Sequence, residues 1–270
     1  MNASSFCDDM TDHSPTVAIL AGGLGTRLHP LTATIPKSMV PVAGEPFITH
    51  QLRLLSQQGF YSVVICLGHL GEQIEAFVGD GYPFGCQVRY SRDGSELLGT
   101  GGAIRQALPL LGPQFAVLYG DSYLTAPFQP ALEDFLTCGR PALMTLLRNQ
   151  NQWQPSNVEF ASGEIVRHDK NRLIPAMEHI DYGLCFFSAE VFQRWPQSSR
   201  FSLSEVLQSL IAKQAIAAFE VADRFYEIGS IMGLQETDQF LRNVFRKRSA
   251  PIQDYAAPSI GTVAIGRDRA

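Results

Sequence analysis

The sequence has 270 residues, of which 45% are hydrophobic and 17% charged, as in a globular protein with a sizeable core. A net charge of −5 provides no overall attraction to nucleic acid or to an anionic membrane. No apolar run approaches the ~20 residues that cross a bilayer, and five scattered cysteines without a C-x-x-C pair indicate neither a disulfide framework nor a zinc site.

The first half of the chain alternates short apolar runs with amphipathic segments. Residues 16–21, TVAILA, are typical of a strand buried on both faces. In residues 44–60, Pro46 suits a first helical turn, an apolar stripe follows, and Gly59 suits the helix end. Further strands are expected at 61–68, 86–93 and 114–121, and further helices at 70–80 and 100–112. The alternation predicts βαβ units with right-handed crossovers in an α/β fold with a doubly wound, mostly parallel, Rossmann-like sheet.

The rhythm changes after about residue 150. Residues 157–171 contain two alternating segments around a Ser-Gly pair, which predicts an antiparallel hairpin. A strand at 182–188, a helix that opens with the capping-box pair Ser202 and Glu205, a strand at 217–229 and a helix at 230–248 follow. No repeat or composition shift marks a second large domain. We expect one domain at 15–248, a flexible tail at 1–14 and a C-terminal tail at 249–270, in a cytoplasmic protein.

The stretch AILAGGLGTRLHPLT, residues 18–32, follows the first predicted strand directly. Glycines there let backbone N–H groups approach an anion, usually a phosphate. A Rossmann fingerprint would need glycine in place of Leu28, and a Walker loop would need Gly-Lys-Ser/Thr. What remains is a glycine loop with Arg27, and Lys37 shortly after it, which suits a polyphosphate. The alternative is a tight turn with a solvated arginine.

Asp121 follows the apolar strand at 114–121, at the edge where open α/β sheets bind ligands. A carboxylate beside phosphates requires an intervening cation, so Mg²⁺ ligation is the physical interpretation, and a capping aspartate at a turn is the alternative. The six histidines show no H-E-x-x-H or H-x-E spacing, so no catalytic zinc is indicated.

LAGGLGTRLHPLT followed by TIPKSMVPVAGEPFI resembles the paired signatures of the sugar-1-phosphate nucleotidylyltransferases, or NDP-sugar pyrophosphorylases, and further family elements continue to about residue 241. The resemblance implies that a sugar 1-phosphate attacks the α-phosphorus of a nucleoside triphosphate in line and expels pyrophosphate, with Mg²⁺ as cofactor. It assigns the departing pyrophosphate to Arg27 and the reacting phosphates to Lys37.

The resemblance also implies the nucleotide-binding residues. LLGTGGAI at 97–104 resembles the family's LGTAGAL element, which lies under the base and the ribose. For the two glycines at 101 and 102, simple tight packing of the helix is the alternative. The nucleotide set is Leu20, Ala21, Gly22, Gly23, Gly25, Thr26, Glu96, Gly99, Thr100, Gly101 and Gly102.

Three further segments resemble the metal and sugar elements of the family. FYEIGS resembles W-x-D-I-G-T and implies that Glu227 joins Asp121 as a metal ligand, with an arm one methylene longer. SNVEF, RHDKN and DYGLCF resemble the sugar side, which the antiparallel hairpin forms, although Asp169 and Asn171 replace the usual glutamate and proline. The implied sugar-phosphate residues are Asn157, Glu159, Lys170, Tyr182 and Gly183.

The substrate pair is less constrained. SRDGSELLGTGGAI looks closest to short mannose- or heptose-1-phosphate guanylyltransferases, in which Glu96 would accept hydrogen bonds from guanine, so GTP is favoured. Uridylyl transfer to muramic acid 1-phosphate or another hexose 1-phosphate is the main alternative. The NDP-sugar would be a precursor of a cell-surface polysaccharide. Family habit suggests a homodimer, and the chain lacks the length for an appended β-helix domain.

Two alternatives belong to other classes. A nucleotide-sugar glycosyltransferase would require a D-x-D motif, which the sequence lacks. A regulatory relative that binds without catalysis would have lost Arg27, Lys37, Asp121 or Glu227, and all four are present.

Overall fold

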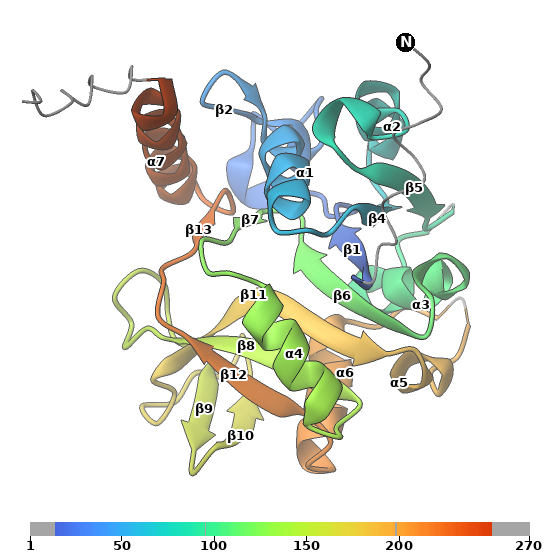
Figure 1. Ribbon diagram of the computed structural model, residues 1–270, viewed down its shortest axis with the longest axis vertical. Coiled ribbons are helices and arrows are strands. Elements are labelled where there is room, and N and C mark those ends of the chain that lie inside the picture. The colour runs from blue at the N-terminus through green and yellow to red at the C-terminus, as the bar shows by residue number, and fades with distance from the viewer. Residues whose placement is uncertain (1–13, 95, 198, 250–270) are drawn as a thin grey trace, which may run out of the picture.

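The computed structural model describes residues 14–94, 96–197 and 199–249. The expectations for the two tails fall almost entirely on residues outside these ranges. The described chain folds around a mixed sheet with helices on both faces (Figure 1), which confirms the predicted α/β class. Within these ranges, no helix is long and apolar enough to cross a membrane.

The first half of the sheet is parallel, as predicted. Strand β1 (Thr16–Leu20) pairs in parallel with β4 (Ser62–Leu67) on one side and β6 (Gln114–Tyr119) on the other, and β4 pairs with β5 (Gln87–Arg92). The carboxyl ends of β1, β4, β5 and β6 therefore reach the same edge of the sheet. This is the edge at which such sheets bind ligands.

The second half adds antiparallel pairing. Strand β11 (His179–Ser188) runs antiparallel to β6 and to β8 (Ala142–Arg148), and β12 (Ala217–Val221) pairs in parallel with β8. The predicted hairpin is confirmed as β9 (Val158–Ala161) and β10 (Glu164–His168). It joins the sheet where His179 of β11 pairs with Val158.

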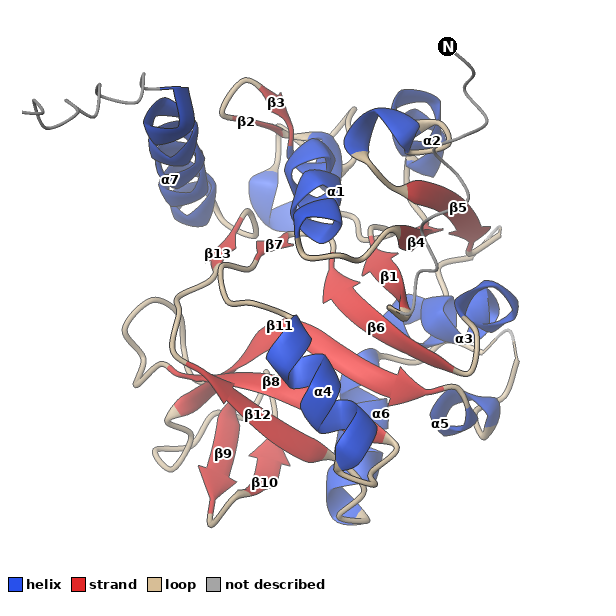
Figure 2. Cartoon of the chain, viewed as in Figure 1, coloured by secondary structure: helices blue, strands red, loops and turns tan. Residues whose placement is uncertain are grey.

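The helices form a layer on each face of the sheet (Figure 2). Helices α1 (Phe47–Gln57), α2 (Gly71–Val78) and α4 (Gln129–Thr137) cover one face. Helices α3 (Gly99–Leu111), α5 (Glu190–Gln193) and α6 (Leu203–Ala212) cover the other. The predicted capping box of α6 is present: the Ser202 hydroxyl accepts from the Glu205 amide, and the Glu205 carboxylate accepts from the Ser202 amide.

A third, smaller layer lies beside α1. The last helix, α7 (Ile231–Ser249), packs against the ribbon of β2 (Pro41–Val42) and β3 (Glu45–Pro46) through a small apolar cluster that includes Val42, Phe47 and Leu241. Pro46, the last residue of β3, lies immediately before α1, whereas the sequence pattern places it in the first turn of this helix.

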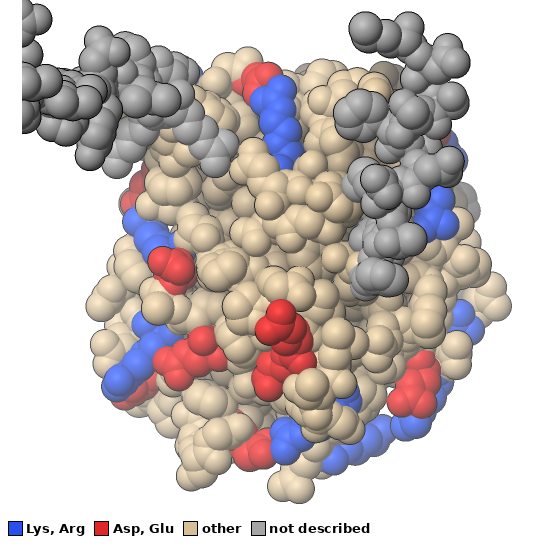
Figure 3. Space-filling model, viewed as in Figure 1, with Lys and Arg blue, Asp and Glu red and all other residues tan. Residues whose placement is uncertain are grey.

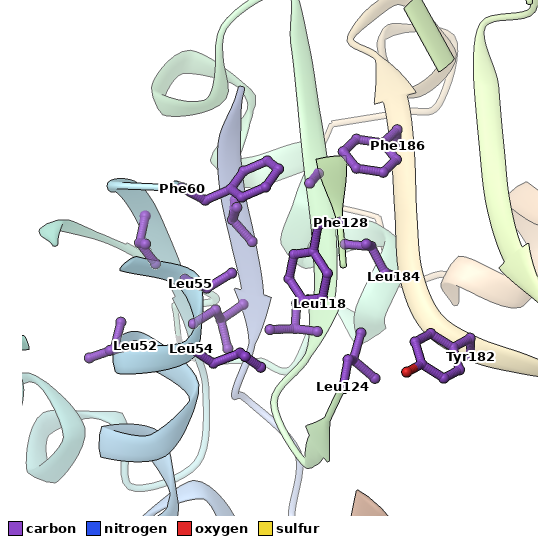
Figure 4. Packing of buried hydrophobic residues seen from close by; sticks show 14 of the residues in the cluster. Leu52, Leu54, Leu55, Phe60, Leu118, Leu124, Phe128, Tyr182, Leu184 and Phe186 are labelled. Carbon is purple, nitrogen blue, oxygen red and sulfur yellow. The ribbon is translucent and has the colours of Figure 1, made fainter. Parts of the chain in front are cut away.

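Alternating residues of the strands pack into the two large hydrophobic cores, one on each face of the sheet. Val17 and Ile19 of β1 belong to the core under α1, whereas Ala18 belongs to the core under α3, and all three are fully buried. Figure 4 shows Leu118 beside Phe128, between the α1 leucines on one side and Leu124 and Leu184 on the other. Burial on both faces explains why β1 reads as a continuous apolar run.

Two features of the second half differ from the sequence prediction. No element was predicted for residues 124–141 or 142–150, yet α4 and β8 lie there. The single strand predicted at 217–229 is wrong, because β12 ends at Val221 and a two-residue strand, β13 (Tyr226–Glu227), follows after a bend. The bend lets β13 leave the main sheet and pair with β7 (Ser122–Tyr123), directly after the carboxyl end of β6.

Candidate active site at the carboxyl edge of the sheet

Glycines let three strand ends approach one another closely. A Cβ atom on Gly68, after β4, would overlap the carbonyl oxygen of Gly22, and a Cβ on Gly120, after β6, would overlap that of Leu20. Close packing therefore requires these glycines whatever ligand binds. Gly23 differs, because a Cβ there would meet no atom within 4 Å.

The glycine loop then turns into a single 3₁₀ turn at Thr26–Leu28. Gly25 begins this turn with φ of +63°, and its carbonyl accepts from the Leu28 amide and the Thr32 hydroxyl. The turn leaves Arg27 exposed. Its guanidinium group lies beside Gly229, because a Cβ atom added to Gly229 would be 3.1 Å from a guanidinium nitrogen. The loop thus brings Arg27 against the segment that follows β13.

A cavity of about 450 Å³ lies over the strand ends, and we call it the larger cavity. Its lining includes three cationic side chains, Arg27, Lys37 and Arg200, and two acids, Asp93 and Asp121. The residues that line it are Leu20, Ala21, Gly22, Gly23, Leu24, Gly25, Thr26, Arg27, Lys37, Ser38, Cys66, Asp93, Leu97, Gly99, Thr100, Ala103, Tyr119, Gly120, Asp121, Arg200 and Gly229.

A second cavity of about 320 Å³, the smaller cavity, opens toward the antiparallel half. Arg27, Tyr119 and Asp121 line both cavities, so the two meet at these side chains. The other residues that line the smaller cavity are Ser122, Gln154, Pro155, Asn157, Lys170, Leu173, Ile180, Asp181, Gly183, Phe225 and Glu227.

Lys37 and Asp121 form an ion pair at this junction. The Lys37 ammonium donates to Asp121 Oδ2 at 2.6 Å, and both side chains are partly buried. Desolvation opposes ionisation of Asp121, but Lys37 more than offsets it, and the pKa of Asp121 lies below its ordinary value.

Glu227 reaches the same place through the β7–β13 ladder. Glu227 is paired with Ser122, and the Ile228 amide donates to the Asp121 carbonyl at 2.9 Å. Its carboxylate accepts from the Gly229 amide. Burial, and then the nearby charge of Asp121, raise the pKa of Glu227.

The donor set of Asp121 and Glu227 fits a hard divalent cation. Both offer carboxylate oxygens, which Mg²⁺ prefers, and Glu227 is held in a place where the negative charge of Asp121 disfavours its ionised form. A cation between them would relieve this repulsion. Among the described residues no group of three or more His, Cys, Asp or Glu side chains forms a complete metal site, so phosphate oxygens or water would have to complete the ligand shell.

Lys170 lies on the floor of the smaller cavity beside Tyr119 and Asp181. Its ammonium is 3.2 Å from both Asp181 Oδ2 and the Tyr119 hydroxyl, and 4.4 Å from the centre of the Tyr119 ring. Asn157 and Gly183 line the same cavity. The structure thus brings three of the five predicted sugar-phosphate residues together.

The other two predicted sugar-phosphate residues do not line the cavity. Glu159 faces Arg167 across the hairpin, with 3.9 Å between Oε2 and Nε. Tyr182 is 1% exposed, and its hydroxyl accepts from the backbone amides of Thr125 and Ala126. Its place is structural, because it ties β11 to the segment before α4.

Three predicted nucleotide residues also lie outside the larger cavity. Glu96 is exposed and does not line it. A Cβ on Gly101 would overlap the Phe201 ring, and a Cβ on Gly102 would overlap the Ser199 carbonyl. Tight packing against the start of α6, the alternative that the sequence left open, therefore accounts for these two glycines.

Tyr119, Asp181 and Asp93 are among the side chains that line the cavities and that sequence reasoning missed. Tyr119 lies within the strand predicted at 114–121 and directly precedes the Gly-Asp pair, which was a usable signal, and Asp181 stands in the quoted DYGLCF segment, one position before the strand predicted at 182–188. Asp93, at the end of β5, carried the same signal. Its Oδ2 accepts from the Leu98 amide, and burial raises its pKa.

Acidic and basic side chains elsewhere are interspersed. On the face shown in Figure 3, blue and red side chains mostly lie next to one another. Ion pairs among the described residues outside the cavities include Arg53–Glu45, Arg140–Glu164 and Arg242–Asp238. The cations at the two cavities are the ones placed to attract a polyanion to the candidate site.

Comparison with known proteins agrees with this geometry. A family model described as nucleotidyl transferase matches residues 16–243. Over 206 residues the chain is 30% identical to a UTP–glucose-1-phosphate uridylyltransferase of Synechocystis, covering 68% of this chain and 52% of that protein. Over 118 residues it is 48% identical to an N-acetylmuramate α-1-phosphate uridylyltransferase of Neisseria meningitidis, covering 42% and 51%. The matches thus span about half the length of these relatives.

A solved structure shares the fold. The crystal structure of HddC from Yersinia pseudotuberculosis, complexed with GMP-PN, superposes with a TM-score of 0.71 at 24% identity, covering 84% of this chain and 99% of that one.

Proposed function

This chain belongs to the nucleotidyl transferase family, and from that membership we propose that it condenses a nucleoside triphosphate with a sugar 1-phosphate to give an NDP-sugar and pyrophosphate. The observation that carries the proposal is the junction of two cavities at Arg27, Tyr119 and Asp121. Two anionic substrates in adjacent cavities would meet where cations and a pair of carboxylates converge. Such a junction suits phosphoryl transfer, in which positioning and charge compensation supply most of the catalysis.

The larger cavity is the proposed nucleotide site. The triphosphate would lie along the glycine loop toward Arg27 and Lys37, where Gly23 leaves room for close approach. The base and ribose would lie toward Leu97, Thr100 and the other less polar lining residues.

The smaller cavity is the proposed sugar-phosphate site. Lys170 would contact the phosphate, while Asn157 and the Gly183 backbone would face the sugar. The reacting phosphate oxygen would then lie beside Asp121, which lines both cavities.

In the proposed reaction, an oxygen of the sugar phosphate forms a bond to the α-phosphorus, and the bond from that phosphorus to the β-phosphate bridging oxygen breaks. The electron pair leaves with pyrophosphate. No side chain is a nucleophile: Arg27 and Lys37 stabilise the charge on the leaving group. Bound Mg²⁺, held by Asp121 and Glu227, would neutralise phosphate charge.

Which nucleotide base the larger cavity binds is a finer question than the type of reaction. The sequence-based preference for GTP came from the likeness of SRDGSELLGTGGAI to short guanylyltransferases, with Glu96 as the acceptor for guanine, whereas Asp93 of this segment lines the larger cavity and Glu96 does not. A carboxylate there would accept from the N3–H of uracil or thymine, or from the N1–H and amino group of guanine, whereas cytosine and adenine would offer it only an exocyclic amino group. The 48% identity to the Neisseria uridylyltransferase favours UTP with an N-acetylmuramic acid 1-phosphate type of sugar, and GTP with a hexose or heptose 1-phosphate is the second candidate.

A panel experiment tests the proposal. Each of the four common nucleoside triphosphates is combined with several sugar 1-phosphates and Mg²⁺, and released pyrophosphate is measured. We expect one pair to dominate. Binding of a triphosphate without turnover by any sugar phosphate would instead support a non-catalytic, regulatory relative.

A further inference from the structure

Asp181 is a fully buried carboxylate beside the smaller cavity. Its Oδ2 accepts from the Tyr119 hydroxyl at 3.0 Å and from the Lys170 ammonium at 3.2 Å, and its Oδ1 accepts from the Gly183 amide at 3.0 Å. All three donor residues, Tyr119, Lys170 and Gly183, line the smaller cavity. The carboxylate therefore joins groups that the proposed sugar phosphate would meet.

The backbone holds Asp181 in this position. The pairing of β11 with β8 shifts register between Asp181 and Cys185, and Gly183 within the shift has φ of +101°. Irregularities of this kind redirect side chains. The Asp181 amide also donates to Asn157 Oδ1 at 3.0 Å, which ties the bulge to the segment before the hairpin.

Lys170 is the counter-ion of this carboxylate. His168 Nε2 lies 3.7 Å from Asp181 Oδ2, but burial lowers the pKa of His168, which leaves it neutral at pH 7. Burial alone would raise the pKa of Asp181, yet Lys170 and its other partners bring it below its ordinary value. The ion pair is thus formed at neutral pH between Asp181 and Lys170.

Lys170 keeps one donor for a ligand. An ammonium has three N–H groups. One contacts Asp181, one contacts the Tyr119 hydroxyl, and 40% of the side chain remains exposed. The third N–H is available to a phosphate oxygen in the smaller cavity.

We propose that Asp181 is a positioning residue for sugar-phosphate binding: directly, and through the Tyr119 hydroxyl that donates to it, it holds the Lys170 ammonium in one place, so that the free N–H of this ammonium is preorganised for the phosphate. This inference rests on the proposed function of the smaller cavity. The inference predicts that removal of the Asp181 charge weakens phosphate binding. Simple charge counting predicts the opposite, because loss of a negative charge near an anion site should strengthen anion binding.

The kinetic test uses Asp181→Asn, which keeps the size of the side chain. With the sugar 1-phosphate that the wild type turns over best, we expect the KM for that substrate to rise about tenfold, as for loss of one charge-assisted contact. The KM for the triphosphate should change less than twofold. Glu164→Gln, which weakens the partly buried ion pair with Arg140 outside both cavities, is the control and should change neither value.

A fall or no change in the sugar-phosphate KM of Asp181→Asn would overturn the inference and leave the proposed function intact. Absence of turnover by the wild type with every substrate pair would overturn the proposed function itself. Equal rises in both KM values would indicate a structural role only, and would also overturn the inference.

A labelling measurement needs no substrate and no variant. Trace acetylation, read by mass spectrometry, compares Lys170 with the exposed Lys213 in the folded wild type. We expect Lys170 to react at least tenfold more slowly, because its amine is held protonated by Asp181. In Asp181→Asn its relative reactivity should rise severalfold. Equal reactivity of the two lysines in the wild type would overturn the inference even where the variant does not fold.

Discussion

The Lys37 ammonium and the Asp121 carboxylate, 84 positions apart in the chain, lie 2.6 Å from each other where the two cavities meet. This contact places a cation that can bind phosphate on the same carboxylate that is proposed to hold Mg²⁺. Lys37 and the proposed Mg²⁺ therefore compete for Asp121.

The first prediction concerns Lys37 in turnover. Lys37→Ala should lower kcat for pyrophosphate release about 10²-fold or more, the usual cost of removing one group that stabilises a charged transition state. Lys213→Ala, an exposed lysine on α6's C-terminal side, should leave kcat unchanged. Near wild-type release by Lys37→Ala would contradict its role.

The second prediction concerns the metal. In the absence of nucleotide, Lys37→Ala should bind Mn²⁺ more tightly than the wild type, because the competing ammonium is gone, whereas Asp121→Asn should bind it far more weakly. Titration followed by the electron paramagnetic resonance signal of free Mn²⁺ measures both. Identical affinities in all three proteins would show that Asp121 is not a metal ligand.

The third prediction separates two acids near the base. Asp93→Asn should lower kcat/KM for the preferred triphosphate by about 10- to 100-fold, because a site built to accept a hydrogen bond from the base loses its acceptor. Glu96→Gln should change it less than threefold, since Glu96 is exposed outside the cavity. The reverse order would restore Glu96 as the residue that contacts the base.

The fourth prediction distinguishes glycines by what surrounds them. Gly101→Ala should lower the free energy of unfolding by about 1–3 kcal/mol, because its methyl group would overlap Phe201. Gly23→Ala should leave stability nearly unchanged and raise the KM for the triphosphate. Chemical denaturation measures the free energy of unfolding of both variants, and steady-state kinetics measures their KM for the triphosphate. Equal losses of stability in the two variants would contradict the assignment of Gly101 to packing and Gly23 to the ligand.

The fifth prediction concerns pH. The pKa of Asp181 lies below its model-peptide value of 3.8 in the folded protein, so the folded state binds its proton less readily than the unfolded state. Its ionised form therefore contributes stability that is present above about pH 4 and is lost as the pH falls below that value. The stability difference between the wild type and Asp181→Asn should shrink from pH 5 to pH 3 in denaturation curves. A constant difference would show that Asp181 does not titrate in this range.

Sequence patterns located the parallel half of the fold well because its signals are local. The apolar run at 16–21 and the glycines after it mark β1 and its loop. Because β1 is buried on both faces, its sequence is continuously apolar and shows no alternation of polar and apolar residues. The segment 124–150 offered no comparable pattern, and α4 and β8 were missed. The bend after Val221 depends on a partner strand, β7, that lies about 100 positions earlier, and no local pattern reports such a pairing.

The candidate site shows the same contrast between local sequence signals and contacts supplied by distant segments. Arg27, Lys37, Asp121 and Glu227 stand in recognisable motifs, and the structure brings them to one junction. Which glycines face a ligand was not readable, since Gly23 and Gly101 differ only in neighbours supplied by distant segments. Asp181 was overlooked because its importance lies in partners on β6 and after β10, not in its own segment.

The two-residue ladder of β7 and β13 has a consequence for synthesis on the ribosome. Residues 16–123 can form the parallel strands and the glycine loop, but Glu227 reaches Asp121 only through β13. A nascent chain shorter than about 230 residues therefore has one acid of the pair and lacks the other. Translation must therefore pass nearly the whole domain before the two acids can be brought together.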